Sequence, residues 1–300
     1  MNKVSTLGRR NTIAGMLFVG PALIYMIAVV GYPMVYNVIL SFQDLNVMTF
    51  RDQTQQFVGF DNYIYLLTNP VFLQSMWQTF IFTIACLVIQ FTLGFVLALF
   101  FSQKFPLGGP IRGAIVISYM MPMAVTGLIW NNMFQTHTGI VNHLLGLAGL
   151  IQAPLEWLIS ADLALISVII ANSWVGIPFN MLLLTAGMTS IPQDVYESAQ
   201  VDGANYFQRL FLITMPLLKP AIMAVLMLGF IYTFKIFDLI IIMTNGGPLH
   251  FTQVISTYSY RLAFTEFRFS LGSTGGVILF FCLMAVGGIY LWLINREEKN

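Results

Sequence analysis

Apolar residues in this chain gather into six charge-poor windows separated by more polar stretches. A helix of about 20 apolar residues crosses the hydrocarbon core of a bilayer, and each window is long enough to do so. We therefore predict an all-α polytopic membrane protein with six transmembrane helices, forming one transmembrane domain over residues 1–300. The predicted spans are Ile13–Leu40, Gln78–Phe101, Gly113–Phe134, Leu163–Met188, Pro220–Thr244 and Ser273–Ile294.

The composition of the chain agrees with this pattern. Hydrophobic residues make up 58% and charged residues 8% of the chain, against roughly 45–50% and about 25% in soluble domains. The formal net charge is +1 and no dense cluster of Lys and Arg is present, which argues against a nucleic-acid partner. The sequence therefore predicts the lipid bilayer, and not a nucleic acid, as a partner of this chain.

The first apolar window follows Arg9 and Arg10, as a secretory signal would. The charge-free run that follows, residues 11–43, is too long for the apolar region of such a signal. We therefore expect a membrane anchor that stays on the chain.

Lys and Arg near the ends of spans are retained on the cytoplasmic side of the membrane, and this sets the orientation. With the N-terminus inside, nine basic residues are cytoplasmic, three lie outside, and Lys235 falls within the membrane. Both termini are then cytoplasmic, as is the connection over residues 189–219. The nine are Lys3, Arg9, Arg10, Lys104, Arg112, Arg209, Lys219, Arg296 and Lys299, and the three are Arg51, Arg261 and Arg268.

The connection over residues 189–219 has the signals of short helices. Ser190 with Gln193 fits a capping box, and Pro192 suits a first helical turn. Gly203 supplies a left-handed residue where the helix stops.

A second short helix is expected directly after the first. Asn205 with Gln208 can begin it, and Pro216 is expected to end it before the fifth span.

Two connections on the outer side, residues 41–77 and 135–162, are rich in Asn, Gln, Asp and aromatic residues. They could contact an external partner. They could equally be solvated connections that pack on each other.

The chain has little metal or thiol chemistry. Cys86 and Cys282 fall inside apolar windows, where a free thiol behaves as a small hydrophobe, so we expect no disulfide. His137, His143 and His250 do not have the spacing of a metal-binding helix.

Two motif searches argue against nucleotide binding or catalysis in this chain. A P-loop needs Gly-Lys followed by Ser or Thr, and no Gly-Lys pair occurs. No G-x-S-x-G nucleophile elbow occurs either. If a nucleotide drives this protein, we expect another chain to bind it.

Lys235 and Asp238 lie three residues apart in the fifth window, so on a helix they would share a face and could pair. An unpaired charge at mid-membrane costs roughly 2.5–3.5 kcal/mol on insertion scales. The two residues therefore face the protein interior or a wet cavity. Asp238 could lie on a solute pathway, or the pair could fix helix packing.

Helix breakers occur in several windows, at Pro122, at Pro178 and at the segment 245–248, Asn-Gly-Gly-Pro. Interruptions of this kind are tolerated where the freed backbone lines a cavity.

Asn172, Trp174 and Asn180 lie close to Pro178. They offer amides for hydrogen bonds and a ring that can stack on a sugar face. Packing of polar residues between helices would explain each of them as well.

The chain resembles the membrane subunits of bacterial binding-protein-dependent ABC importers, in the carbohydrate-uptake branch of maltose-type and glycerol-3-phosphate-type permeases. The resemblance covers nearly the whole chain and is strongest at the family's E-A-A-x-x-D-G-A motif with a later Pro. Ser198 stands where the family usually has Ala. The motif reads Glu197-Ser198-Ala199-Gln200-Val201-Asp202-Gly203-Ala204, with Pro216 following.

Two further stretches resemble the carbohydrate branch in particular. One is Phe57-Val58-Gly59-Phe60-Asp61-Asn62-Tyr63, and the other is Phe237-Asp238 followed by Thr244-Asn245-Gly246-Gly247-Pro248.

The resemblance implies a permease subunit of the bacterial inner membrane that forms half of a pathway for a sugar, oligosaccharide or polyol. Its partners would be a second homologous permease, two ATPase subunits and an extracytoplasmic solute-binding protein. ATP and Mg²⁺ would bind the ATPase subunits, so this chain would hold no cofactor and would not be an enzyme. The residues implied in ATPase coupling are Glu197, Ser198, Ala199, Asp202, Gly203, Ala204 and Pro216.

These residue types suit a short helix that enters a cleft of a partner. Small residues such as Ser198, Ala199 and Gly203 allow close approach, and Glu197 and Asp202 offer charge-assisted hydrogen bonds.

Two other classes of protein remain as alternatives. One is an ion-coupled secondary transporter that uses Lys235 and Asp238 as a relay, although such folds typically show internal repeats and we find none that is convincing. The other is an intramembrane enzyme assembled from residues distant in sequence.

Overall fold

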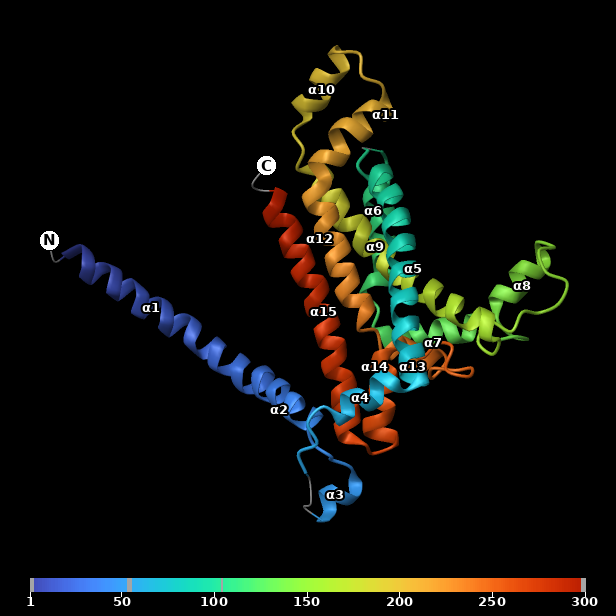
Figure 1. Cartoon of the computed structure of the whole chain (residues 1–300). Coiled ribbons are helices and arrows are strands. Elements are labelled where there is room, and N and C mark those ends of the chain that lie inside the picture. Colours follow the sequence, from blue (N-terminus) through green and yellow to red (C-terminus); the bar gives the residue numbers. More distant parts are fainter. Residues whose placement is uncertain (1–2, 53–55, 104, 298–300) are drawn as a thin grey trace. The chain divides into compact units, whose positions relative to one another are not determined.

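The computed structural model describes residues 3–52, 56–103 and 105–297, and within these ranges every regular element is a helix (Figure 1). The prediction of an all-α chain is confirmed. The helices fall into two compact units by their contacts, and each unit is described separately.

The first unit takes the described residues of Met1–Thr68 and Ser259–Ile278. Its N-terminal part is one long apolar helical run, interrupted only by a π-helical turn. The elements are α1 Lys3–Met26, the π-helix η1 Ile27–Gly31, α2 Tyr32–Ser41, α3 Val47–Asp52, α4 Asp61–Thr68 and the π-helix η3 Arg261–Thr265.

Within this unit, the aromatic-rich stretch at residues 57–63 closes the connection after the first span. The ring of Phe42 packs against that of Tyr63 at a centroid distance of 5.3 Å. The amide of Asn62 donates to the carbonyl of Ser41 at 3.0 Å. The ring and amide contacts of this stretch therefore hold it against the end of the first span.

The second unit takes Asn69–Tyr258 and the described residues of Leu279–Asn300. Two helices, α14 Ile255–Tyr260 and α15 Phe269–Glu297, belong partly to each unit. The others are α5 Pro70–Phe101, α6 Gly108–Met120, α7 Met123–Met133, α8 Ile140–Leu147, α9 Ala161–Thr189, α10 Gln193–Val201, α11 Tyr206–Arg209, the π-helix η2 Leu210–Thr214, α12 Met215–Phe234 and α13 Asp238–Met243.

Five helical runs in the described residues are long and apolar enough to cross a bilayer, and the pair α6 and α7, bent by 98°, makes a sixth when it is counted as one broken span. The prediction of six spans is confirmed. The fifth predicted span ends at Phe234 and not at Thr244, because the helix breaks at residues 235–237. The five runs are Gly15–Ser41, Pro70–Phe101, Ala161–Thr189, Tyr206–Phe234 and Phe269–Trp292.

The two prolines expected to break spans behave differently. Pro122 is the N-cap of α7 and lies at the sharp bend, as predicted. Pro178 lies inside the continuous helix α9, so the expected break there is wrong. Pro178 has no N–H for the carbonyl of Trp174 four residues earlier, and that carbonyl accepts from the hydroxyl of Ser118 at 3.4 Å instead.

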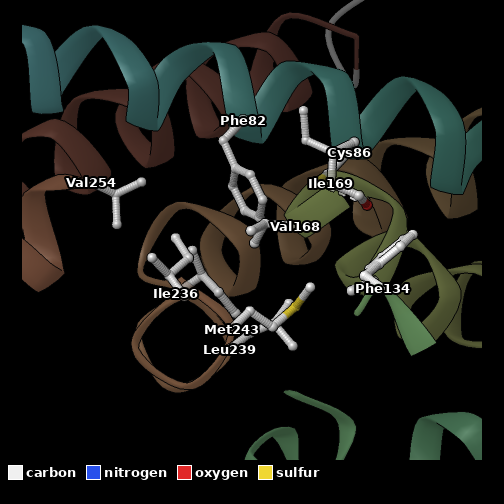
Figure 2. Close-up of a cluster of buried hydrophobic side chains, with 11 residues drawn as sticks. Phe82, Cys86, Phe134, Val168, Ile169, Ile236, Leu239, Met243 and Val254 are labelled. Atoms are coloured by element: carbon white, nitrogen blue, oxygen red, sulfur yellow. Dashed lines mark hydrogen bonds between the residues drawn. The ribbon is translucent and has the colours of Figure 1, made fainter. Parts of the chain in front are cut away.

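The core of the second unit forms where α5, α9 and α13 meet. Figure 2 shows Phe82 projecting from α5 into a cluster that includes Val168 of α9 and Leu239 of α13. All three of these side chains are fully buried. This packing fixes α13 against the two longest helices of the unit.

Close approach of α5 and α9 depends on a glycine of α5. A Cβ added at Gly94 would lie 2.5 Å from the Cβ of Asn180 and 3.1 Å from the carbonyl oxygen of Ile177. Apolar burial provides little drive for helices to associate in lipid, so small residues that allow such close contact are what hold spans together.

Replacing Gly94 with Ala should therefore push α5 and α9 apart. Overpacking of this kind typically costs about 1–3 kcal/mol, so we expect a lower thermal unfolding midpoint for the purified chain. Gly113→Ala on α6, where a Cβ would meet nothing within 4 Å, is the matched control. Equal midpoints for the two variants would contradict this account of the packing.

Candidate functional site

The charged residues of the fifth predicted span do not share a helical face. Lys235 is the C-cap of α12, and Asp238 is the first residue of α13. No hydrogen bond or ion pair joins the two side chains in the described part of the chain. The predicted pairing on one helix is wrong, because the helix breaks between the two residues.

Each charge lies instead at the helix end that favours its sign. A helix carries partial negative charge at its C-terminus and partial positive charge at its N-terminus. Lys235 is at the C-terminus of α12 and Asp238 at the N-terminus of α13, and each such contact typically contributes about 0.3–1 kcal/mol. The ammonium of Lys235 also lies 5.4 Å from the ring centre of Tyr232.

A cavity of about 570 Å³ opens at this break. This volume is within the usual range for small-molecule sites. Six helices of the second unit and the break itself supply its walls. Its polar lining residues are Gln90, Asn172, Thr233, Lys235 and Asp238, together with the hydroxyls of Tyr119 and Tyr232.

Three aromatic rings follow one another along the wall of the cavity. Tyr119 of α6 and Phe179 of α9 lie 5.5 Å apart by ring centres. Phe179 and Tyr232 of α12 lie 6.1 Å apart, edge to face. The cavity thus combines apolar ring surfaces with hydrogen-bonding groups at the break between α12 and α13.

Gln90 is a cavity residue that the sequence analysis missed. It is only 3% exposed, and its amide nitrogen donates to the carbonyl of Asn172 at 3.3 Å. A Cβ at Gly176 would collide with the Gln90 amide, so a glycine at that position is what makes room for it. A glutamine in the middle of an apolar window was the signal that could have found it.

The three polar residues predicted near Pro178 have different surroundings. Asn172 is buried and lines the cavity. Trp174 is partly buried and packs edge to face against Trp130 at 6.1 Å. Asn180 is buried and donates to the carbonyl of Gly176 at 2.8 Å. Of the three, the structure brings only Asn172 to the cavity wall.

The polar connection after α9 forms a short helix with a well-defined end. In α10, Glu197 and Ser198 are exposed, while Ala199 is buried against the rest of the chain. Gly203 has φ of +79° and donates to Gln200, and Ala204 donates to Ala199 at 2.9 Å. This pair of bonds is a Schellman motif, so the left-handed stop predicted at Gly203 is confirmed.

Of the starts predicted for the two short helices of this connection, the structure confirms one and contradicts the other. Asn205 and Gln208 form a reciprocal capping box at the start of α11, as predicted. Pro192 is the N-cap of α10, and the hydroxyl of Ser190 donates back to Gly187 at 2.7 Å. The capping box predicted for Ser190 and Gln193 is therefore wrong.

Pro216 does not end a helix. α11, η2 and α12 form one apolar helical run, Tyr206–Phe234, in which Pro216 occupies the first turn of α12. A proline cannot donate to the carbonyl four residues earlier, and the wider π-turn of η2 directly precedes it. The expected stop before the fifth span is wrong, because the π-turn takes up the irregularity.

The fold and the site define a class: a multi-span helical membrane protein with a cavity at a broken helix and an exposed, capped polar helix between two spans. A family model described as "Binding-protein-dependent transport system inner membrane component" matches residues 90–298. This chain belongs to that family of importer membrane subunits.

Curated relatives match almost end to end. The trehalose/maltose transport system permease of Thermococcus litoralis is 33% identical over 89% of this chain and 94% of its own length. The sulfoquinovosyl glycerol transport system permease of Agrobacterium fabrum is 30% identical over 95% and 92%. The trehalose transport system permease of Mycobacterium tuberculosis is 33% identical over 95% and 89%.

Solved structures confirm the fold. A subunit of a bacterial ABC transporter for import of the acidic polysaccharide alginate superposes with a TM-score of 0.81, at 22% identity, over 99% of both chains. An amino acid ABC transporter gives 0.55, at 15% identity, over 79% of this chain and 98% of its own.

The family assignment decides between the classes left open by the sequence. The chain is a transmembrane subunit of an ATP-driven importer and is not an enzyme, and ATP hydrolysis belongs to separate subunits in this family. The resemblance to membrane subunits of binding-protein-dependent ABC importers, strongest at residues 197–204, is confirmed. The ion-coupled secondary transporter finds no support.

Because Lys235 and Asp238 are not an ion pair, their substitutions should act independently. We expect the effects of Lys235→Gln and Asp238→Asn on thermal stability to add within about 0.5 kcal/mol in the double variant. A double-mutant cycle on the purified chain measures this. A coupling energy well above this value would indicate an ion pair between the two side chains and would contradict the structure.

Proposed function

We propose that this chain forms half of the translocation pathway for a sugar, oligosaccharide or polyol. The observation that carries the proposal is the cavity at the break between α12 and α13. Sugars present apolar C–H faces and many hydroxyls, which suit aromatic rings beside amide and charged groups. Tyr119, Phe179 and Tyr232 supply the rings, and Gln90 and Asp238 supply hydrogen-bonding groups.

The relatives support the same class of solute. Two are permeases for trehalose or maltose and one is a permease for sulfoquinovosyl glycerol, and the alginate structures concern a polysaccharide. Asp238, Lys235 and Asn172 are the proposed contacts among the residues found by sequence. Trp174 and Asn180 would support the wall through helix packing.

The connection over residues 189–219 is the proposed coupling loop. Its motif residues Glu197, Asp202 and Gly203 are exposed. Val201 at the end of α10 is 88% exposed and Phe207 at the start of α11 is 68% exposed. Exposed apolar side chains beside a polar helix suit a protein partner, which here would be an ATPase subunit.

The proposed assembly has one further permease subunit, two ATPase subunits that bind ATP and Mg²⁺, and an extracytoplasmic solute-binding protein. One crystal structure of the alginate transporter contains its periplasmic binding protein, which supports the last of these. The coupling loop and both termini would lie in the cytoplasm, in agreement with the distribution of Lys and Arg.

The coupling loop can be tested at Gly203. Its φ of +79° costs an L-residue about 1–2 kcal/mol, and a Cβ there would meet nothing within 4 Å, so Gly203→Val acts through the backbone alone. We expect the ATPase subunit to be lost from the tagged, purified chain, or its hydrolysis to be uncoupled from uptake.

Gly113→Val is the matched control, because Gly113 is an exposed helical glycine of α6 that also has open space around it. It should leave co-purification and uptake unchanged. Undiminished uptake in Gly203→Val would refute the assignment of the loop.

The solute pathway can be tested at Tyr232. If its ring stacks on a sugar, Tyr232→Leu should weaken solute binding by about twofold to tenfold, since such ring contacts contribute about 0.5–1.5 kcal/mol. The measurement is direct binding of a panel of sugars and polyols to the purified transporter, without its binding protein. The control is Tyr36→Leu, at an exposed tyrosine of α2 outside the cavity, which should bind the solute as wild type does. Wild-type binding by Tyr232→Leu would mean that the pathway lies elsewhere.

A further inference from the structure

A second cavity, of about 590 Å³, lies beside the coupling loop. It is enclosed by the end of α5, the end of α9, and the helices α10, α11 and η2. Its lining includes Gln103, Tyr196, Tyr206 and Arg209, and contains no Asp or Glu. The one charged group in the described wall is therefore a cation.

Arg209 has no partner for its charge within the described chain. Its Nε is buried without a hydrogen bond, and no ion pair or ring contact involves its guanidinium. An arginine stays protonated in proteins. The side chain of Arg209 is half-buried, and its buried Nε–H is satisfied neither by this chain nor by bulk water, which is costly for a charged group. The counter-anion of Arg209 is therefore expected to come from outside this chain.

The hydroxyl groups beside Arg209 are already engaged. Thr214 donates to the carbonyl of Arg209 at 3.2 Å. The hydroxyls of Tyr196 and Thr214 share a hydrogen bond of 3.0 Å. This chain of bonds holds the backbone of Arg209 in place beneath the cavity.

Two further donors in the wall are unused. The hydroxyl of Tyr206, which is 50% exposed, and the exposed side-chain amide of Gln103 make no hydrogen bond with the described residues. With the guanidinium they offer several N–H and O–H groups to one ligand. A phosphate, which accepts through several oxygens and carries charge, is the chemistry that such donors bind best.

The position of Arg209 along its helix indicates where the phosphate comes from. Arg209 is the fourth residue of the apolar run Tyr206–Phe234. Just beyond it, Phe211 is 61% and Leu212 72% exposed, as expected where a helix enters lipid. Basic pockets between helices at this level bind the headgroups of anionic lipids.

We propose that this cavity binds the phosphate of an anionic phospholipid, with Arg209 as its cation and Tyr206 and Gln103 as further donors. The site is separate from the solute cavity and does not depend on which solute is carried. It would tie the lipid composition of the membrane to the segment that links the coupling loop to the fifth span.

The test is native mass spectrometry of the full chain, in the assembly in which it leaves the membrane, titrated with phosphatidylglycerol or phosphatidylcholine. Wild type should retain phosphatidylglycerol preferentially, and Arg209→Gln should bind it about fivefold more weakly, which corresponds to about 1 kcal/mol. Arg209→Lys keeps the charge and should lose less of the affinity for phosphatidylglycerol. Arg112→Gln, an exposed arginine of α6 outside the cavity, should match wild type.

Three results would overturn the proposal. Equal retention of phosphatidylglycerol by wild type and Arg209→Gln would mean that Arg209 does not bind the lipid. Binding of inorganic phosphate together with equal retention of phosphatidylglycerol and phosphatidylcholine would assign the site to a soluble anion. Loss of a co-purifying subunit from Arg209→Gln, with lipid retained, would identify a carboxylate of that subunit as the counter-anion. If Arg209→Gln does not assemble, Arg209→Lys and Tyr206→Phe give the same comparison.

Discussion

The structure depends on one constraint of the bilayer, namely that backbone N–H and C=O groups must be satisfied within the protein or face water. Two interruptions of regular helix fall within the apolar part of the second unit, at Pro122 and at residues 235–237. Both border the same cavity, since Met123, Ile236 and Phe237 line it. The freed carbonyl of Ile236 accepts from the hydroxyl of Ser256. The two breaks therefore border the cavity, although the freed carbonyl of Ile236 is satisfied by Ser256 and not by a group of the cavity wall.

The same constraint explains why other irregularities leave no cavity. Pro178 leaves the carbonyl of Trp174 without its helical partner in the middle of α9. The hydroxyl of Ser118 of α6, which donates to Ile115 at 2.9 Å, also reaches this carbonyl at 3.4 Å. Asn180 and Thr185 turn their side chains back onto carbonyls of their own helix. A proline or polar residue in a span therefore does not by itself mark a cavity, because a neighbouring group can meet its hydrogen-bonding needs. Asn172 and Asn180 illustrate the difference: both are buried, but only Asn172 lines the cavity.

Much of this architecture could be predicted from the sequence because it depends on local rules. The six spans follow from length and hydropathy, and the ends at Gly203 and Asn205 follow from backbone conformation and capping. The errors concern residues whose behaviour depends on the third dimension. Pro216 is accommodated by a π-turn and Pro178 by a hydroxyl on another helix, and neither compensation can be read from nearby residues. Lys235 and Asp238 have a spacing that fits one helical face, but they lie at the ends of two helices. Gln90 was missed because its role depends on Gly176 of a different helix.

The continuous helix from Tyr206 to Phe234 gives the proposed coupling a physical basis. Its 29 residues, at a rise of about 1.5 Å each, span about 43 Å. One end follows the capped turn at Asn205, and the other carries Lys235 at the cavity. Had Pro216 ended a helix, as the sequence suggested, movement of the loop would be absorbed at a hinge. Because the run is unbroken, a displacement of the loop would be carried along the axis to Tyr232 and Lys235, where it would change the wall of the cavity. The break at residues 235–237 then separates this moving helix from α13, which is fixed in the core by Leu239.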